Sequence, residues 1–316
     1  MVMDVKVKNM ARRVEGMYNA HPFPSRYNIP SGKSDERYKY IYQNFLHIPL
    51  DEMKEKLFFD AGCGTGDNTW AWRRILDPST RVIGLDLSRA SVNIARQANA
   101  AEQSPLFGVN SLLNLGVANE SVDFLLCSGV LVAIPDPDRA FKELVRVLKP
   151  GGYIVIILYH KYGRAIHGFR RAVIDLLEPE DIDRRAKLGG KLFGGSMERM
   201  AQSENSPLEG VLYDQFGLPC ESRYSVGDAL KWFGQTGLKY NGSWPPVEWS
   251  QFGKGFRYSK DFAWLRQTSF GQWLLRLFPD QNILPGGPPD FFTRLSMESL
   301  WALKQLQLFA VSGRKG

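Results

Sequence analysis

The chain has 316 residues, of which 44% are hydrophobic and 23% are charged. These fractions are those of a globular protein and exclude a disordered tail, a collagen and a coiled coil. Its net charge of +7 favours acidic partners only weakly, because the sequence contains no run of five basic residues.

The cysteines and the hydropathy pattern indicate a cytoplasmic protein. Three cysteines are too few for a disulfide framework, and without a Cys-x-x-Cys pair we expect no bound metal. The N-terminal residues lack the apolar stretch of a signal peptide, and no apolar run approaches the ~18 residues of a membrane span. We therefore expect a cytoplasmic protein that does not span a membrane, and its oligomeric state stays open.

Residues 1–50 mix charged and aromatic side chains. Because a proline excludes its predecessor from the α region, the segment His21–Pro24 must be extended or turned. The stretch 34–47 is predicted to be a helix. We expect residues 1–50 to form a lid over a ligand, with packing on the outer face of a sheet as the alternative.

From residue 56 onwards, apolar strands alternate with helices. The predicted strands are residues 57–60, 81–86, 106–109, 122–127, 153–159, 238–244 and 308–312. The predicted helices are residues 67–76, 89–101, 138–148, 225–236 and 297–306. Strands that are apolar on both faces and alternate with helices predict an α/β fold, with a Rossmann-like, doubly wound and mostly parallel sheet of seven strands.

Two irregular stretches are far longer than the ~4–6 residues of an ordinary loop, and we interpret them as inserted caps. The predicted organisation is an N-terminal lid (1–50), a ligand-binding core (51–160), a cap insertion (161–222), a continuation of the core (223–244), a second insertion (245–295) and a final helix and strand of the core (296–316).

A glycine turn between the first strand and the first helix is the most informative motif. Residues 60–67 read Asp-Ala-Gly-Cys-Gly-Thr-Gly-Asp, and Asp86 ends the second strand. Glycines let a ligand approach the backbone and the helix N-terminus, and the second-strand carboxylate can accept both ribose hydroxyls of a nucleoside. A dinucleotide site requires GxGxxG, whereas this spacing is GxGxG with Asp67 next. That carboxylate would repel a pyrophosphate, so S-adenosylmethionine is favoured over NAD.

Four motifs in this order resemble those of the class I S-adenosylmethionine-dependent methyltransferases. They are residues 60–66, 84–88, 127–138 and 144–153. The resemblance covers about residues 56–160 and returns at 225–244 and 308–315. Two departures from the family pattern are Val132, where many small-molecule members have His, and Asn110, where Asp is commoner.

The resemblance implies a role for each cofactor-binding residue. The glycines would line the methionyl and ribose portion, Asp60 would order the amine indirectly, and Asp86 would hold the ribose. Asn110 and Ser111 would face the adenine, and Ser128 and Gly129 would lie over the cofactor. The implied cofactor-binding set is Asp60, Gly62, Cys63, Gly64, Gly66, Asp86, Leu87, Asn110, Ser111, Ser128 and Gly129.

A general base would assist transfer to a hydroxyl or an acidic carbon. His160 is the first candidate because it directly follows the fifth strand, and His167 and His21 come next; for each, the alternative is a structural or surface histidine. Further candidates are Tyr159, Tyr162, Tyr213 and Asp214. Basic residues of the insertion are candidates for contacting an anionic substrate, or form the solvated face of helices: Arg164, Arg170, Arg171, Arg184, Arg185, Lys187 and Lys191.

The resulting hypothesis is an S-adenosylmethionine-dependent methyltransferase that acts on an O, N or C atom of a small molecule by in-line displacement. Two alternatives remain: a nucleic-acid or protein methyltransferase, and a non-catalytic protein that binds S-adenosylmethionine. The sequence argues against a nucleic-acid partner, because it contains no Asn/Asp-Pro-Pro-Tyr base-flipping motif and no RNA-binding module. It does not name the acceptor.

Overall fold

The computed structural model describes most of the chain. The described residues are 2–24, 33–97, 105–204, 206–248, 257, 266–277 and 287–316. About half of the second predicted insertion, 245–295, and the end of the helix predicted at 89–101 lie outside these residues. Within the described part, every helix is too short or too polar to cross a bilayer.

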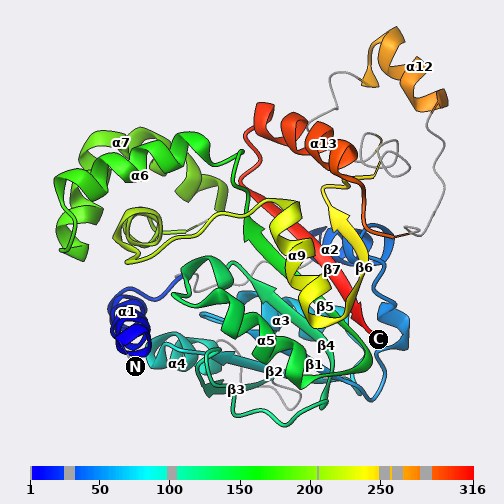
Figure 1. The fold of residues 1–316 in the computed structure, drawn as a ribbon, viewed down its shortest axis with the longest axis horizontal. Helices are drawn as coiled ribbons and strands as arrows, with labels where there is room; N and C mark the ends of the chain where they lie inside the picture. Colours follow the sequence, from blue (N-terminus) through cyan, green and yellow to red (C-terminus); the bar gives the residue numbers. More distant parts are fainter. Residues whose placement is uncertain are drawn as a thin grey trace.

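A seven-stranded sheet forms the centre of the described structure (Figure 1). Its strand order is β3-β2-β1-β4-β5-β7-β6; β1 to β5 pair in parallel, and β7 runs antiparallel to both β5 and β6. The strands are β1 (Leu57–Ala61), β2 (Arg81–Asp86), β3 (Leu106–Val109), β4 (Val122–Ser128), β5 (Leu148–Tyr159), β6 (Leu238–Trp244) and β7 (Leu308–Lys315). The predicted Rossmann-like, mostly parallel fold is confirmed.

The central strands bury both of their faces, which explains their continuous apolar sequences. Along β1, Phe58 and Phe59 are both buried but belong to different core clusters, because successive side chains of a strand point to opposite faces. Helices α5 (Pro137–Val147) and α9 (Val226–Thr236) cover one face, and α2 (Lys33–Asn44) and α3 (Asp67–Ile75) cover the other. Parallel sheets require such cover on both sides.

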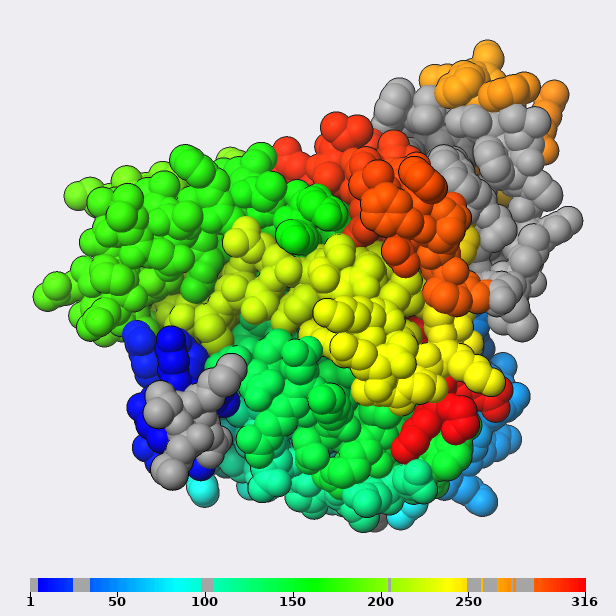
Figure 2. All heavy atoms as spheres, viewed as in Figure 1, coloured from blue at the N-terminus to red at the C-terminus, as the bar shows by residue number. Residues whose placement is uncertain are grey.

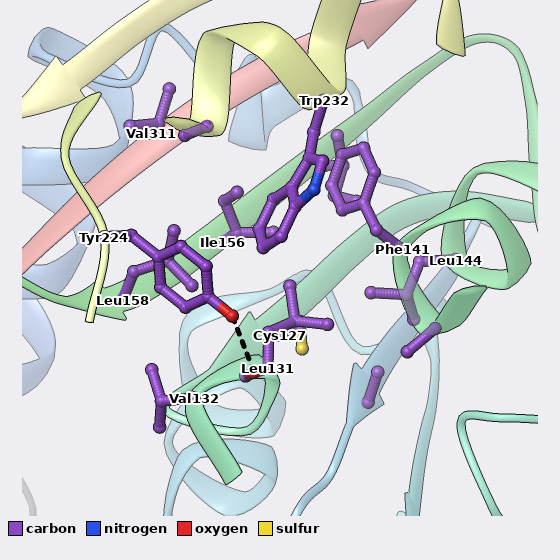
Figure 3. Close-up of a cluster of buried hydrophobic side chains, with 14 of the residues drawn as sticks. Cys127, Leu131, Val132, Phe141, Leu144, Ile156, Leu158, Tyr224, Trp232 and Val311 are labelled. Carbon is purple, nitrogen blue, oxygen red and sulfur yellow. Dashed lines mark hydrogen bonds between the residues drawn. The ribbon is translucent and has the colours of Figure 1, made fainter. Parts of the chain in front are cut away.

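On the face of α5 and α9, aromatic side chains fill the core (Figure 3). Phe141 of α5 stacks on Trp232 of α9 with ring centroids 5.2 Å apart. Tyr224 donates a hydrogen bond of 3.4 Å to the carbonyl of Leu131. This bond attaches the segment leading into α9 to the turn after β4.

The ends of α9 follow from its sequence. Ser225 accepts from the Asp228 backbone N–H, and the Asp228 side chain accepts from the Ser225 N–H, which completes a capping box. Gly237 ends the helix in the left-handed conformation at φ 74°. The last helix, α13 (Phe291–Leu303), starts earlier than predicted because Asp290 accepts from the N–H groups of the first turn.

Helix α1 (Val2–Ala20) was not predicted from the sequence. It lies beside α4 (Arg89–Gln97) in Figure 1, where the Ser88 hydroxyl donates to the Tyr18 carbonyl at 3.0 Å. Asn19 Oδ1 also accepts from the Ala90 N–H at 3.1 Å and so helps to cap α4 from another part of the chain. These contacts attach the N-terminal segment to the sheet domain.

The first insertion is helical and forms a separate body above the sheet, coloured green in Figure 2. It comprises α6 (Ala165–Leu177), α7 (Ile182–Glu204), α8 (Leu208–Leu212) and the π-helical turn η3 (Tyr213–Gly217). Its core contains Ile174, Met197 and Phe216, and Phe23 from the N-terminal segment packs against it. The remaining described elements are the short helices η1 (Leu50–Glu52) and η2 (Leu131–Ala133), and α12 (Ser269–Leu277).

Candidate functional site

The glycine turn lies at the carboxyl end of β1 and adopts a backbone that other residues rarely adopt. Gly62, Gly64 and Gly66 have φ values of 82°, 52° and 91°. A Cβ on Gly62 would lie 2.2 Å from a methyl group of Val130, and a Cβ on Gly64 would lie 2.7 Å from the Phe23 carbonyl oxygen. Both positions therefore require glycine for conformation and for space.

Asp86 connects this turn to the end of β2. Its Oδ2 accepts from the Gly64 N–H at 2.9 Å, and its Oδ1 accepts from the Ser88 N–H at 2.8 Å. Burial raises the pKa of this carboxyl group. Each carboxylate oxygen has a second lone pair, so Asp86 retains acceptor capacity for two ligand hydroxyls.

Asp60 lies beneath the turn and is fully buried. Its Oδ2 accepts from the Thr69 hydroxyl at 2.6 Å, while Oδ1 accepts no hydrogen bond from any described residue. Burial raises the pKa of Asp60 to about 7, and the charge of Asp86 adds to this shift. A buried, unpartnered carboxylate oxygen is expensive unless a donor reaches it, so this position suits a ligand amine or a water bound to one.

A cavity of about 410 Å³ opens over the turn and Asp86. Nine of the eleven cofactor-binding candidates line it: Gly62, Cys63, Gly64, Asp86, Leu87, Asn110, Ser111, Ser128 and Gly129. The other two, Asp60 and Gly66, are not among its lining residues. The ends of β1, β2, β3 and β4 bring these residues together, as expected for parallel strands that share one carboxyl edge.

The N-terminal segment covers part of this cavity. Glu15 and Tyr18 of α1 line it, as do Phe23 and Pro24 of the segment that follows. The Thr65 hydroxyl donates to the Pro24 carbonyl and so fastens this segment to the glycine turn. Farther along, Tyr42 and Leu46 pack into the core beside α3. The described residues between positions 2 and 50 thus contribute both to the cavity wall and to the core that packs on the sheet.

The π-helical turn η3 contributes a polar group to the cavity. Asp214 is 5% exposed and accepts from Tyr18 at 3.1 Å, from the Gln215 amide at 2.7 Å and from Tyr159 at 3.4 Å. The Arg164 guanidinium lies 3.8 Å from the centre of the Tyr159 ring and donates to Gln215 at 2.9 Å. Burial raises the pKa of Asp214, against the opposing effect of the Arg164 charge.

Buried arginines of the insertion hold this turn in place. Arg171 donates to the carbonyls of Gln215 and Leu218, and Arg185 donates to the carbonyl of Phe216 at 2.9 Å. A π-helix leaves carbonyls that need such partners, and π-helical turns are frequent at functional sites. Among the described cavity-lining residues, Arg164 alone comes from the basic set considered for anion binding.

The three histidines lie outside the cavity lining. Next to cavity-lining Tyr159, His160 points to the opposite side of β5, where its ring packs against Trp301 and Phe309. Its Nδ1 accepts from the Gly163 N–H at 3.1 Å, and its Nε2 lies 3.5 Å from Glu298.

His167 and His21 have other protein partners. His167 Nε2 lies 3.4 Å from buried Glu221, and burial lowers the pKa of the imidazole. The ring of His21 stacks on Tyr213 with centroids 3.3 Å apart. Of the tyrosine candidates, Tyr162 is 45% exposed, and Tyr213 donates to Asp183 at 2.9 Å.

Several cavity residues escaped sequence reasoning, among them Glu15, Gln215 and Gln307. The insertion has no motif that would single out these positions. Asp214 and Tyr159 were only secondary candidates. The pairing of α1 with η3 depends on contacts between residues almost 200 positions apart.

Comparison with known proteins gives one family match. A model described as a methyltransferase domain matches residues 59–156. An uncharacterized protein of Synechococcus sp. is 26% identical over 251 residues, which are 74% of this chain and 60% of that protein. A demethylmenaquinone methyltransferase of Staphylococcus aureus is 32% identical over 98 residues, which are 31% of this chain and 41% of that enzyme. The chain thus spans less than two thirds of these relatives.

Among solved structures, an S-adenosylmethionine-dependent methyltransferase from Mesorhizobium loti is 18% identical, with a TM-score of 0.45 over 85% of this chain and 94% of that chain. The matched residues 59–156 contain the glycine turn, Asp86 and the loop after β4. The cofactor of this family is S-adenosyl-L-methionine, and the unpartnered oxygen of Asp60 and the left-handed glycines fit such a ligand. Residues 59–156 thus match a methyltransferase domain, and the glycine turn, Asp86 and the loop after β4 that they contain are similar to the motifs of the class I S-adenosylmethionine-dependent methyltransferases.

Proposed function

We propose that the protein transfers a methyl group from S-adenosyl-L-methionine to a small molecule bound in the 410 Å³ cavity. The observation that carries this proposal is the composition of the cavity wall. One part comes from the strand ends of the methyltransferase domain, and the other comes from α1, the segment 21–24 and the turn η3. A volume of this order is typical of small-molecule sites.

The methyltransferase domain would supply the cofactor half. Asp86 would accept hydrogen bonds from the ribose hydroxyls, Asn110 and Ser111 would contact the adenine, and the turn 62–66 would leave room for the methionyl portion beside the backbone. Asp60, which is buried beneath the turn and does not line the cavity, would order the ammonium group indirectly. When bound, the cofactor supplies an electrophilic methyl group on a sulfonium.

The remaining cavity wall would position the acceptor. In-line displacement needs the nucleophile about 3–3.5 Å from the methyl carbon, and holding it there can supply a large part of the rate enhancement. The hydrogen bonds from Thr65 to Pro24 and from Tyr18 to Asp214 keep the covering segments against the site. Covering segments held in this way would keep water from the bound acceptor, which strengthens electrostatic interactions in the cavity.

Calorimetric titration with S-adenosylhomocysteine tests the cofactor half. We expect wild-type protein to bind and Asp86→Asn to bind at least tenfold more weakly, because the amide presents one acceptor where the carboxylate presents two. Asp51→Asn, an exposed site on η1, is the matched control and should bind like wild type. Absence of wild-type binding would refute the proposal.

Turnover distinguishes the proposed function from its alternatives. Release of S-adenosylhomocysteine is measured with a small-molecule library, with total RNA and DNA, and with a protein extract. We expect turnover with small molecules. Turnover confined to nucleic acid or protein would identify a macromolecular acceptor, and binding without any turnover would identify a non-catalytic protein.

A further inference from the structure

The polar groups contributed by α1, β5 and η3 are arranged around one carboxylate. Asp214 receives hydrogen bonds from Tyr18, Tyr159 and Gln215. An ionised carboxylate offers about four acceptor positions, so three internal donors leave one on a group that lines the cavity. The protein therefore orients Asp214 firmly and leaves it able to accept one further hydrogen bond.

The charges around the cavity are opposite in sign to those of the whole chain. The chain carries +7, yet the charged residues among the described lining are four carboxylates and a single guanidinium: Glu15, Asp67, Asp86, Asp214 and Arg164. Arg164 also lies 3.3 Å from Glu221, whose side chain is 1% exposed. Its charge is thus shared with a buried partner outside the cavity, and an anionic ligand would meet net repulsion.

The groups beside Asp214 are poorly suited to accept a proton. Burial and the charge of Asp214 raise the pKa of Tyr18 well above its usual range, so its hydroxyl stays a donor. His160, His167 and His21 do not line the cavity. The cavity wall also includes apolar residues of the segment after β4 and of β7, namely Ala133, Ile134, Pro135 and Leu308.

We propose that Asp214 binds the nucleophilic group of the acceptor and removes its proton, and that the acceptor is an amine or an alcohol on an apolar body rather than an anion. This inference rests on the proposed function. The acceptor lone pair forms the new bond to the methyl carbon, the carbon–sulfur bond breaks with its electron pair kept by sulfur, and the acceptor proton passes to Asp214 and then to solvent. The raised pKa of Asp214 makes it a stronger base than an ordinary aspartate.

The first experiment compares three probes of similar shape and different charge. Protein saturated with S-adenosylhomocysteine is titrated with 2-phenylethylamine, 2-phenylethanol and phenylacetate. We expect the amine and the alcohol to bind at least tenfold more tightly than phenylacetate. Equal or tighter binding of phenylacetate, or no binding of the amine and the alcohol, overturns the inference.

The second experiment removes the charge of Asp214. Asp214→Asn keeps the size of the side chain, and we expect it to reduce the amine preference to less than threefold while leaving the affinity for S-adenosylhomocysteine within twofold of wild type. Glu198→Gln, at an exposed position on α7, is the matched control and should keep the preference. An unchanged preference in Asp214→Asn overturns the inference. If this variant does not fold, the comparison of probes on wild type decides.

Turnover tests the proton transfer. With a library of amines, alcohols, carboxylates and phosphates, we expect methylation among the amines and alcohols, with kcat lowered by about 10²–10⁴-fold in Asp214→Asn. Methylation confined to the anions, no methylation of any amine or alcohol, or a kcat within twofold of wild type overturns the inference. Failure to bind S-adenosylhomocysteine would instead refute the proposed function, so the two failures are distinguishable.

Discussion

The Tyr18 hydroxyl donates to Asp214 Oδ1 at 3.1 Å, although 196 positions separate the two residues. Tyr18 is also attached to the sheet domain, because its carbonyl accepts from the Ser88 hydroxyl at 3.0 Å. Helix α1 therefore connects the start of α4 to the turn η3, and under the proposed function acceptor binding is expected to depend on residues from three distant parts of the chain.

Replacing Tyr18 with Phe removes this connection and keeps the ring. The variant should lose about 0.5–1.5 kcal/mol of unfolding free energy, the usual net value of such a hydrogen bond. Its affinity for S-adenosylhomocysteine should stay within twofold of wild type, whereas binding of 2-phenylethylamine should weaken. Chemical denaturation and calorimetry measure these effects. Tyr162→Phe, at a 45% exposed ring, is the control and should change neither; equal effects in both variants would argue against a specific role of Tyr18.

Gly62 is required by the conformation of the turn. In Gly62→Ala the residue keeps a φ near 82°, and the new methyl group collides with Val130. We expect a loss of about 1–3 kcal/mol of unfolding free energy from the strained backbone alone, together with weaker cofactor binding. Gly194→Ala is the matched control: it lies within α7 with nothing near the new Cβ, and it should be stabilising by about 0.5–1 kcal/mol. Denaturant unfolding compares the two.

Asp60 makes stability depend on pH near neutrality. Because burial raises its pKa from 3.8 to about 7, the folded state binds this proton more tightly than the unfolded state does. The stability of the cofactor-free protein should therefore fall as pH rises from about 4 to about 7. Asp60→Asn lacks this term, so its stability relative to wild type should increase over that range by up to about 4 kcal/mol. A constant difference between the two proteins from pH 4 to 7 would contradict the prediction.

The contribution of Glu221 to stability depends on pH in the opposite direction to that of Asp60. Burial alone would raise its pKa, but the interactions with His167, Arg164 and Arg171 lower it to about 2. Its contribution to stability is present above pH 4.5 and is lost as pH falls towards 2. Glu221→Gln leaves buried Arg164 and Arg171 without their carboxylate and should cost about 3–5 kcal/mol at pH 7.

His167, which contacts Glu221, adds a second pH dependence to the stability of the protein. Burial lowers the pKa of His167 below 6.5, so stability also falls as pH drops below 6.5, because the buried imidazole must become charged. Thermal unfolding between pH 7 and 3 measures the contributions of both Glu221 and His167 to the pH dependence of stability. Glu221→Gln should show a shallower decline than wild type below pH 4.5, and parallel curves would count against the assigned role of Glu221.

The sheet domain could be predicted from the sequence because its signals are local. Apolar runs, proline and glycine stops and capping residues such as Ser225 fix strands and helices within a few positions. Helix α1 escaped prediction because its apolar side is narrow. Val14 and Met17 are buried only once the sheet domain and the insertion lie beside it.

Residues beyond the methyltransferase domain show why closeness in the sequence does not predict which side chains line the cavity. Tyr159 and His160 are adjacent at the end of β5, yet only Tyr159 lines the cavity, because neighbouring side chains of a strand point to opposite faces. For the arginines of the insertion, too, the sequence does not predict the partner. Arg171 and Arg185 look like anion ligands in sequence, but in the structure they hold the carbonyls of η3.

By itself, the sequence determined the alternation of strands and helices, the glycine turn and the carboxylate at the end of β2, because each depends on residues close together in the chain. Only the tertiary structure decided which side chains meet across the cavity. Asp214 gains its three donors because α1, β5 and η3 meet at one wall of the cavity. Those contacts join segments that are far apart in the sequence. Burying their polar groups is favourable only when donor and acceptor meet, so the contacts form only once the whole chain has folded.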